Sequence, residues 1–205
     1  AAHDFTCAQY ETDAKRWQDI EQLFKRQGWS QWALAVKDAF PLNNDRSIQY
    51  RYVLSSDVPC SQKRLTELVQ KWITLEHPNI LPLPADQTVD LKVQTLWDNV
   101  AHSYRVFSAA YVSAKSETFV EFKENRLRIT VTVSRYVMGA ANPFQVNSDT
   151  PLVGDCYPFD LNGKWKNVMA MAYINSNQKA LDQVPSLLNY LNRHAAAPAK
   201  SDKDW

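Results

Sequence analysis

The sequence predicts an α+β protein in which an antiparallel sheet is backed by helices. An alternating stretch over Glu117–Met138 has the pattern of a β-hairpin. A single apolar stripe over Gln62–Leu75 has the spacing of an amphipathic helix, which must be buried against another element. Helical spacing returns after residue 164, so the main strands are grouped in the middle of the chain with helices around them. This grouping is typical of the α+β class.

The hairpin is the clearest signal because its alternation and its pairing register agree. A turn at Glu124–Asn125 places Phe122 opposite Leu127 on one face. The same turn places Glu121 opposite Arg128 on the other face. The apolar residues of the second strand, which we expect to point inward, are Leu127, Ile129, Val131 and Val133. The polar residues that alternate with them and should point outward are Arg126, Arg128, Thr130, Thr132 and Ser134.

The N-terminal segment predicts an extra helix and an extra strand ahead of the main sheet. Residues 1–11 show no pattern, and Thr12 can cap a helix that ends before Gly28. Trp29–Lys37 alternates in polarity and predicts a short strand. A second strand over Ser47–Ser55 then leads into the Gln62–Leu75 helix.

The middle of the chain predicts a meander of four strands. Glu76–Asp86 contains three prolines and is predicted to be an extended loop. Two strands are expected over Val89–Trp97 and Ser103–Ser113, with a turn starting at Asp98–Asn99 between them. The short segment SAKS then connects to the two strands of the hairpin.

The C-terminal third predicts a long loop followed by helices. Gly139–Gly163 has no periodicity, and a loop of this length is either functional or a structural cover. Helical spacing over Lys164–Asn175 continues to Leu191. Pro185 lacks a backbone donor, so a break or kink is expected near Gln183–Val184.

Length and composition bound the class of protein. We divide the 205 residues into an extension (1–46) packed on the main domain, an α+β domain (47–194) and a mobile tail (195–205). The net charge is +1 without a basic run, which disfavours nucleic-acid binding. No apolar run approaches the roughly 18 residues of a transmembrane helix. The chain begins without methionine, as a trimmed chain or a processed secreted protein would.

The sequence contains no motif for a cofactor or a structural metal, and we expect neither. The three cysteines, Cys7, Cys60 and Cys156, form no C-x-x-C pair. One disulfide with one free thiol, and three buried thiols, both fit the sequence, which leaves any pairing open. Only four glycines are present, which argues against a glycine-rich phosphate loop.

The titratable residues show no catalytic or metal-binding spacing. None of the histidines forms a metal-ligand pair such as H-E-x-x-H; they are His3, His77, His102 and His194. His194 should close the last helix, where a cation suits the negative end of the dipole. Oxygen donors gather in the long loop at Asn142, Asn147, Asp149, Asp155 and Asp160. They could bind calcium, but turn formation is the explanation we favour.

Seven tryptophans are an unusual feature of the composition. Trp72 and Trp165 lie on apolar helix stripes and are expected in the core. One of Trp29 and Trp32, which flank a predicted strand start, could be exposed and stack on a sugar or a partner, but a place in the core is the interpretation we favour.

The outward face of the hairpin is the best candidate surface for a ligand. Its residues are Arg126, Arg128, Thr130 and Thr132, with Glu121 and Phe119 across the hairpin. A row of arginine and threonine side chains could hold an anionic or hydroxyl-rich ligand through charge-assisted hydrogen bonds. An ordinary solvated face with cross-strand pairs is the alternative, and we favour it.

Three stretches carry a resemblance to a known family: YRYVLSSDVPCSQKRLTELVQKWI, ENRLRITVTVSRYVM, and GKWKNVMAMAYI followed by LLNYL. On these stretches the core from Ser47 to about His194 resembles secreted proteins of Gram-negative envelopes, a family of unknown function with a TBP-like fold. The resemblance implies a curved antiparallel sheet backed by helices, an exported protein and no established activity. Residues 12–37 are not part of that pattern, and the fold name does not imply DNA binding.

We therefore expect a non-enzymatic periplasmic or secreted module whose signal segment is absent from this chain. It would bind a small ligand or an envelope protein through the sheet face or the loop 139–163. The alternative is a hydrolase whose site is assembled from distant residues. A histidine such as His77 or His102 beside a serine, cysteine or aspartate in a deep cleft would favour the hydrolase. The identity of the ligand or partner and the oligomeric state are not encoded in any motif.

Overall fold

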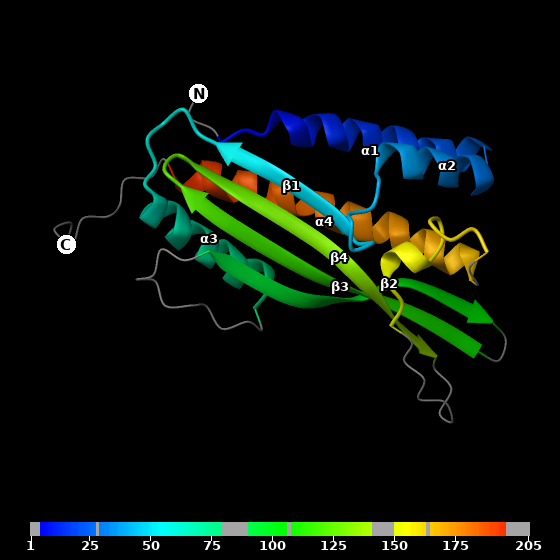
Figure 1. Cartoon of the computed structure of the whole chain (residues 1–205). Helices are drawn as coiled ribbons and strands as arrows, with labels where there is room; N and C mark the ends of the chain where they lie inside the picture. The colour runs from blue at the N-terminus through cyan, green and yellow to red at the C-terminus, as the bar shows by residue number, and fades with distance from the viewer. Residues whose placement is uncertain are drawn as a thin grey trace.

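Four antiparallel strands form one sheet in the order β1-β4-β3-β2 (Figure 1). The computed structural model describes residues 5–27, 29–78, 90–105, 108–140, 150–162 and 165–195. The strands are β1 (Ile48–Ser55), β2 (Leu91–Arg105), β3 (Ser108–Lys123) and β4 (Arg126–Ala140). The helices are α1 (Ala8–Gln27), α2 (Trp29–Ala39), α3 (Gln62–Glu76), the 3-10 turn η1 (Val153–Asp155) and α4 (Lys166–His194). The predicted α+β class, with an open antiparallel sheet backed by helices, is confirmed.

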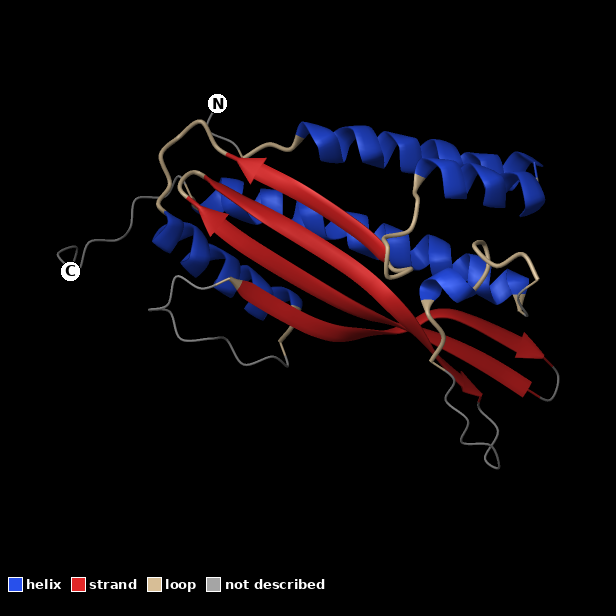
Figure 2. Ribbon diagram, in the orientation of Figure 1, coloured by secondary structure: helices blue, strands red, loops and turns tan. Residues whose placement is uncertain are grey.

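The helices lie on one side of the strongly twisted sheet. In Figure 2, α3 and α4 lie behind the strands, and α1 with α2 lies along the edge formed by β1. None of these four helices crosses the opposite face. The two faces therefore have different environments, which we call the inner face (toward the helices) and the outer face.

The predicted hairpin is confirmed residue by residue. Phe122 pairs with Leu127 and Glu121 pairs with Arg128 across β3 and β4. Asn125 has a positive φ of 65° in the turn, a conformation that asparagine tolerates better than most residues. The four apolar residues expected to point inward, Leu127, Ile129, Val131 and Val133, are all buried.

The predicted four-strand meander is wrong, because three long strands occupy its place. The SAKS segment does not turn: Ser113 pairs with Val137 and Lys115 with Arg135, so β3 continues through it, with a register shift at Lys115/Ser116. Asp98–Asn99 is a bulge inside β2 instead of a turn between strands. Pairing resumes beyond it at Ala101, so the chain reverses only after Arg105. The predicted loop Glu76–Asp86 lies largely outside the described residues.

The predicted strand Trp29–Lys37 is also wrong, because these residues form helix α2. The sequence alternates at Trp32, Leu34 and Val36, which suggested a strand. In the structure Trp32 and Val36 are fully buried while Leu34 is 58% exposed, so burial follows helical spacing. Helix α1 likewise begins at Ala8 instead of following a cap at Thr12.

Helix α4 is continuous through Pro185, so the expected break is absent. Pro185 removes one backbone donor, but Leu181, Val184 and Leu187 around it are fully or almost fully buried. This packing holds the turn in a helical form. The other correction concerns Trp165, which was expected in the core but is 49% exposed at the start of α4. Trp72 and Trp32 are buried, whereas the side chain of Trp29 lies outside the described residues.

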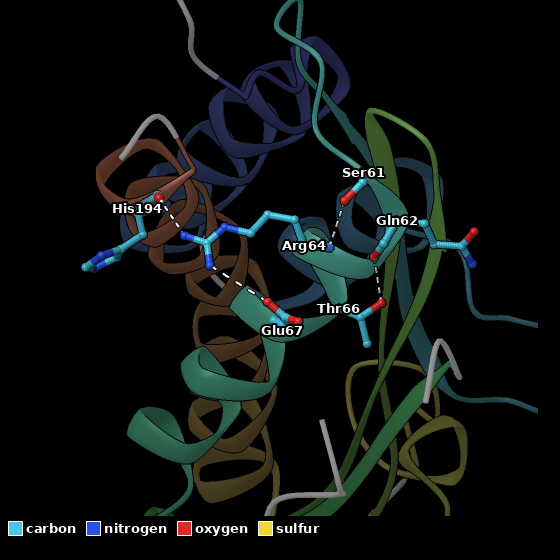
Figure 3. A network of polar contacts seen from close by, with 6 residues as sticks. All are labelled: Ser61, Gln62, Arg64, Thr66, Glu67 and His194. Atoms are coloured by element: carbon cyan, nitrogen blue, oxygen red, sulfur yellow. Dashed lines mark hydrogen bonds and ion pairs between the residues drawn. The ribbon is translucent and has the colours of Figure 1, made fainter. Parts of the chain in front are cut away.

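A polar network joins the start of α3 to the end of α4 (Figure 3). Ser61 caps α3, its Oγ accepting a hydrogen bond of 3.1 Å from the Arg64 amide. The Arg64 guanidinium then donates to the backbone oxygen of His194, at 3.2 Å, and lies 3.9 Å from Glu67. His194 closes α4 as expected, and Arg64 from another helix supplies a cation at the negative end of its dipole.

One apolar cluster joins the inner face to all four helices. It contains Trp17 and Trp32 from the N-terminal helices, Trp72 from α3 and Tyr173 from α4. The rings of Trp17 and Trp32 each pack edge-on against Tyr173, with centroids 5.8 Å apart. The N-terminal helices therefore share their core with the sheet. All three cysteines are buried free thiols, the second of the two states that the sequence allowed.

Candidate functional site

The predicted surface residues do lie together on the outer face, but the structure gives them different environments. Arg128 forms a two-pronged contact with Glu121, its Nε and one terminal nitrogen each donating to a carboxylate oxygen at 2.8 Å. This geometry is the strongest that an arginine and a carboxylate can adopt. Glu121 neutralises the charge of Arg128, so the main role of Arg128 is to form an ion pair with the neighbouring strand. Arg126 lies beside it in a hollow of about 290 Å³ near the hairpin turn.

Thr130 departs from the expected solvated face, because it is only 6% exposed. Its neighbours across the sheet are Arg51 on β1 and Phe119 on β3. The Phe119 ring is in turn approached by the Lys92 ammonium, 5.8 Å from the ring centroid. Large side chains on either side therefore cover the small threonine and close the middle of the outer face.

A larger groove of about 620 Å³ opens farther along the outer face. Of the predicted residues, only Thr132 lines it. The full lining is Asp45, Gln94, Thr95, Leu96, Lys115, Ser116, Glu117, Thr132, Ser134 and Val137. We call this the outer groove.

The outer groove lies where both strand pairings of β3 become irregular. The register between β3 and β4 shifts at Lys115/Ser116, so that Ser134 has no partner on β3. The register between β2 and β3 shifts between Trp97 and Ala101, next to Leu96. Bulges bend a strand and re-aim its side chains. The groove therefore results from the bulges, and Ser134 is the extra residue that one of them inserts.

Most of the residues that line the outer groove are of polar type, although their apolar atoms also contribute to its surface. Four of its ten lining residues carry hydroxyl groups, one carries an amide, two are acidic, one is basic and two are apolar. Glu117 accepts a hydrogen bond from Gln94 at 3.1 Å and lies 3.7 Å from the Lys92 ammonium. The Ser47 side chain and amide donate to the Asp45 carboxylate, and these hydrogen bonds lower the pKa of Asp45. Asp45 is therefore ionised at neutral pH.

Two polar groups of the groove have no partner within the described part of the chain. These are the Ser134 hydroxyl and the Lys115 ammonium. By contrast, the Thr95 and Ser116 hydroxyls bond to each other at 3.0 Å, and Thr132 accepts from Gln49 at 3.3 Å. The free hydroxyl and ammonium are thus the groups best placed to meet a ligand.

Sequence reasoning found the face but not the groove. Asp45 is far from β3 and β4 in sequence, and its presence at the groove depends on the link between α2 and β1. Lys115 was hidden because SAKS was expected to be a connection, whereas Ser134 was expected to point outward but was not included among the candidate ligand residues. The usable signal was the Ser-Ala-Lys-Ser sequence itself, which breaks the alternation of large apolar residues inside a strand.

The described residues do not assemble the catalytic constellation that a hydrolase would need. The His102 ring lies 5.0 Å from that of Tyr104, and His77 caps α3, where burial lowers its pKa. Neither ring hydrogen bonds to a serine, cysteine or aspartate within the described ranges. In the loop, Asp155 pairs with Arg46 at 3.0 Å and Asp160 accepts from the Asn162 amide. Asn142, Asn147 and Asp149 lie outside the described residues, and elsewhere no three His, Cys, Asp or Glu side chains form a metal-binding group.

Comparison with known proteins identifies two solved structures. A TBP-like protein from Parabacteroides distasonis matches with 11% identity and a TM-score of 0.48, over 75% of this chain and 97% of that one. A DUF4468 family protein from Bacteroides ovatus matches with 12% identity and a TM-score of 0.43, over 78% and 92%. Both names agree with the resemblance inferred from the sequence, and similarity at this level carries nothing about function. No family model and no curated protein matches the chain.

Among the described residues, no helix has the length and apolar character that crossing a membrane requires.

Proposed function

We propose that this protein is a non-enzymatic binding module whose outer groove holds a small, hydroxyl-rich and uncharged ligand. The observation that carries the proposal is the groove itself, about 620 Å³ lined mainly by polar residues, on a sheet whose other face is packed with helices. This volume lies within the range of ordinary small-molecule sites, which is roughly 300–1,000 Å³.

The charges of the groove favour a neutral ligand over an anionic one. Asp45 and Glu117 outnumber Lys115 among the lining side chains. The arginines that suggested an anion lie elsewhere, and Glu121 already neutralises Arg128. Hydroxyl and amide groups at the walls match the alternating donors and acceptors of a sugar or polyol. The exposed side chain of Leu96 and that of Val137 offer apolar contacts for its C–H groups.

The non-enzymatic part of the proposal rests on the absence of a base held beside a nucleophile in the described residues. Export to the periplasm or beyond stays a prediction that rests on the family resemblance alone. Of the 139–163 loop, the other surface suggested by the sequence, the structure describes residues 139–140, which end β4, and residues 150–162. The outer groove is therefore the better supported of the two surfaces.

The test is a titration with short neutral oligosaccharides and with their sulfated counterparts, followed by calorimetry. We expect a neutral sugar to bind and Ser134→Ala together with Lys115→Met to weaken its binding by about tenfold, since each change removes a hydrogen-bonding group that has no partner in the described part of the chain. Arg128→Ala and Thr130→Ala are the matched controls on the same face and should leave binding unchanged. If only the controls lose binding, the ligand sits at the hairpin end and the groove proposal fails. Binding of sulfated sugars alone would also contradict it.

A further inference from the structure

A second pocket, distinct from the outer groove, lies between the N-terminal helices and the start of β1. Its volume is about 220 Å³. Helix α1 contributes Asp13 and Arg16, the end of α2 and the following link contribute Phe40, and the inner face contributes Tyr50. Tyr173 of α4 completes the wall. The pocket therefore exists only because the N-terminal helices pack on the sheet.

The wall of this pocket is aromatic and firmly held. Tyr50 and Tyr173 are almost fully buried behind it. The Phe40 ring packs edge-on against Tyr50, with centroids 6.1 Å apart. The Tyr50 hydroxyl donates to the side chain of Asn177, so the ring is held at both ends. Phe40, the half-buried ring of this wall, can receive an apolar side chain of a ligand, and the buried tyrosines behind it keep it in place, so little rearrangement is needed.

Two opposite charges line the same pocket without pairing with each other. The Asp13 Oδ2 accepts a hydrogen bond of 2.7 Å from the Tyr52 hydroxyl, and an Arg16 terminal nitrogen donates to the Ala39 carbonyl at 3.3 Å. These contacts orient both side chains. Within the described residues no ion pair joins them, although they are three residues apart on one helix. The other carboxylate oxygen and the remaining guanidinium N–H groups have no partner in this part of the chain.

We infer that this pocket binds a free α-amino acid with an apolar side chain. The ligand carboxylate meets Arg16, its ammonium meets Asp13, and its side chain lies on the aromatic wall. A purely anionic ligand would face Asp13, and a purely cationic one would face Arg16, so a zwitterion fits the charges best. The volume of the pocket limits the size of the ligand, because about 220 Å³ is below the roughly 300 Å³ at which sites for drug-sized molecules begin.

The experiment titrates the full chain with L-leucine and L-phenylalanine in a calorimeter. N-acetyl-L-phenylalanine, which lacks the ammonium, and L-phenylalaninamide, which lacks the carboxylate, are the matched ligands. We expect the free amino acids to bind and each blocked form to bind about tenfold more weakly, as the loss of one charged hydrogen bond implies. Equal affinity for free and blocked forms, or no binding at millimolar concentrations, overturns the inference.

Two variants locate the binding at these residues. Arg16→Gln should weaken L-phenylalanine about tenfold yet leave L-phenylalaninamide unchanged, because the amide has no carboxylate to lose. Asp13→Asn should weaken L-phenylalanine and leave N-acetyl-L-phenylalanine unchanged, because that ligand has no ammonium to lose. The amide oxygen of the new asparagine can still accept from Tyr52. Lys15→Gln and Asp19→Asn, on the exposed side of the same helix, are the controls. A loss of the same size in either control contradicts the inference. Arg16 is exposed, so its variant tests the site even if Asp13→Asn impairs folding.

Discussion

The two faces of the sheet are built from the same strands, but one face is buried under the helices and the other carries exposed polar residues. On the inner face of β4, Leu127, Ile129 and Val131 are buried against α3 and α4. On the outer face, the alternating residues Arg126 and Arg128 are exposed. Because successive side chains of a strand point to opposite faces, the sequence alone assigns each of these residues to a face.

The comparison shows that period alone does not decide burial on the outer face. Thr130 and Thr132 both point outward, yet Thr130 is buried and Thr132 lines the outer groove. Thr130 lies between the large side chains of Arg51 and Phe119, whereas Thr132 lies near a bulge. Neighbouring side chains and bulges therefore divide one face into a closed part and an open part. Changes to the inner face should cost stability, and changes to the open part should cost binding.

Alkaline titration should show the largest difference between the faces. Burial raises the pKa of the inner-face tyrosines Tyr50, Tyr52 and Tyr136, and that of Tyr173 beneath them, above the ordinary value. Above the unfolded pKa of about 10, the folded state then holds more protons, so its stability falls as pH rises further. We expect cooperative unfolding in alkali, with a delayed rise in phenolate absorbance. A smooth titration of all tyrosines without loss of circular dichroism would contradict the burial.

Truncation of a single core residue should have the next largest effect. Ile129→Ala leaves a cavity at a fully buried position and should lower the free energy of unfolding by about 2–5 kcal/mol. Lys123→Ala, at an exposed position on β3, should change it by less than about 0.5 kcal/mol. Urea denaturation followed by circular dichroism measures both. Equal effects would mean that the faces are not distinct.

A substitution against the link between α2 and β1, which brings Asp45 to the outer groove, should have a smaller effect on stability. A Cβ at Gly154 would lie 2.6 Å from the Arg46 Cβ and 2.9 Å from its backbone oxygen, so the link must move. Gly154→Ala should cost about 1–3 kcal/mol of unfolding free energy. Gly139→Ala, where nothing lies within 4 Å of the new Cβ, should leave stability unchanged or raise it by less than about 1 kcal/mol. Thermal melts of the two variants would separate these outcomes, and a stable Gly154→Ala protein would show that the link yields freely.

The sequence predicted the parts of the fold that depend on local patterns. The alternation around Glu124–Asn125 and the stripe of α3 are each complete within one element, so both were predicted correctly. The strand prediction for Trp29–Lys37 failed because Trp32, Leu34 and Val36 have the period of a strand, while Trp32 and Val36 alone also have the spacing of a helix face. In the structure Trp32 packs against Tyr157 and Tyr173, contacts with distant residues that the pattern of the segment does not show. A local sequence pattern cannot predict the secondary structure of a segment whose conformation is decided by tertiary contacts.

The candidate site was predicted less well, because a groove depends on irregularities. The outward residues of β4 followed from the alternation, and Thr132 was identified in this way. The alternation also placed Ser134 on this face, but the register shift at Lys115/Ser116, which leaves Ser134 without a partner on β3, depends on both strands. Asp45 reaches it through the contact of its link with Gly154. Neither a register shift nor a contact between distant loops has a signature in a single sequence.

The smallest predicted effect is the coupling energy between Arg128 and Glu121 at the hairpin end, which tells whether Arg128 is held by its ion pair or is available to a ligand. A double-mutant cycle of Arg128→Ala and Glu121→Ala should give a coupling energy of about 0.2–1 kcal/mol, the range for half-exposed pairs. The pair Lys92 and Glu117 also spans two strands, but its single 3.7 Å contact should give a smaller coupling. Both couplings should shrink at high salt, because solvent-exposed charges are screened. If Arg128 and Glu121 were uncoupled, the arginine would be available to an anion, and an anionic ligand at the hairpin end would be favoured over a neutral one in the outer groove.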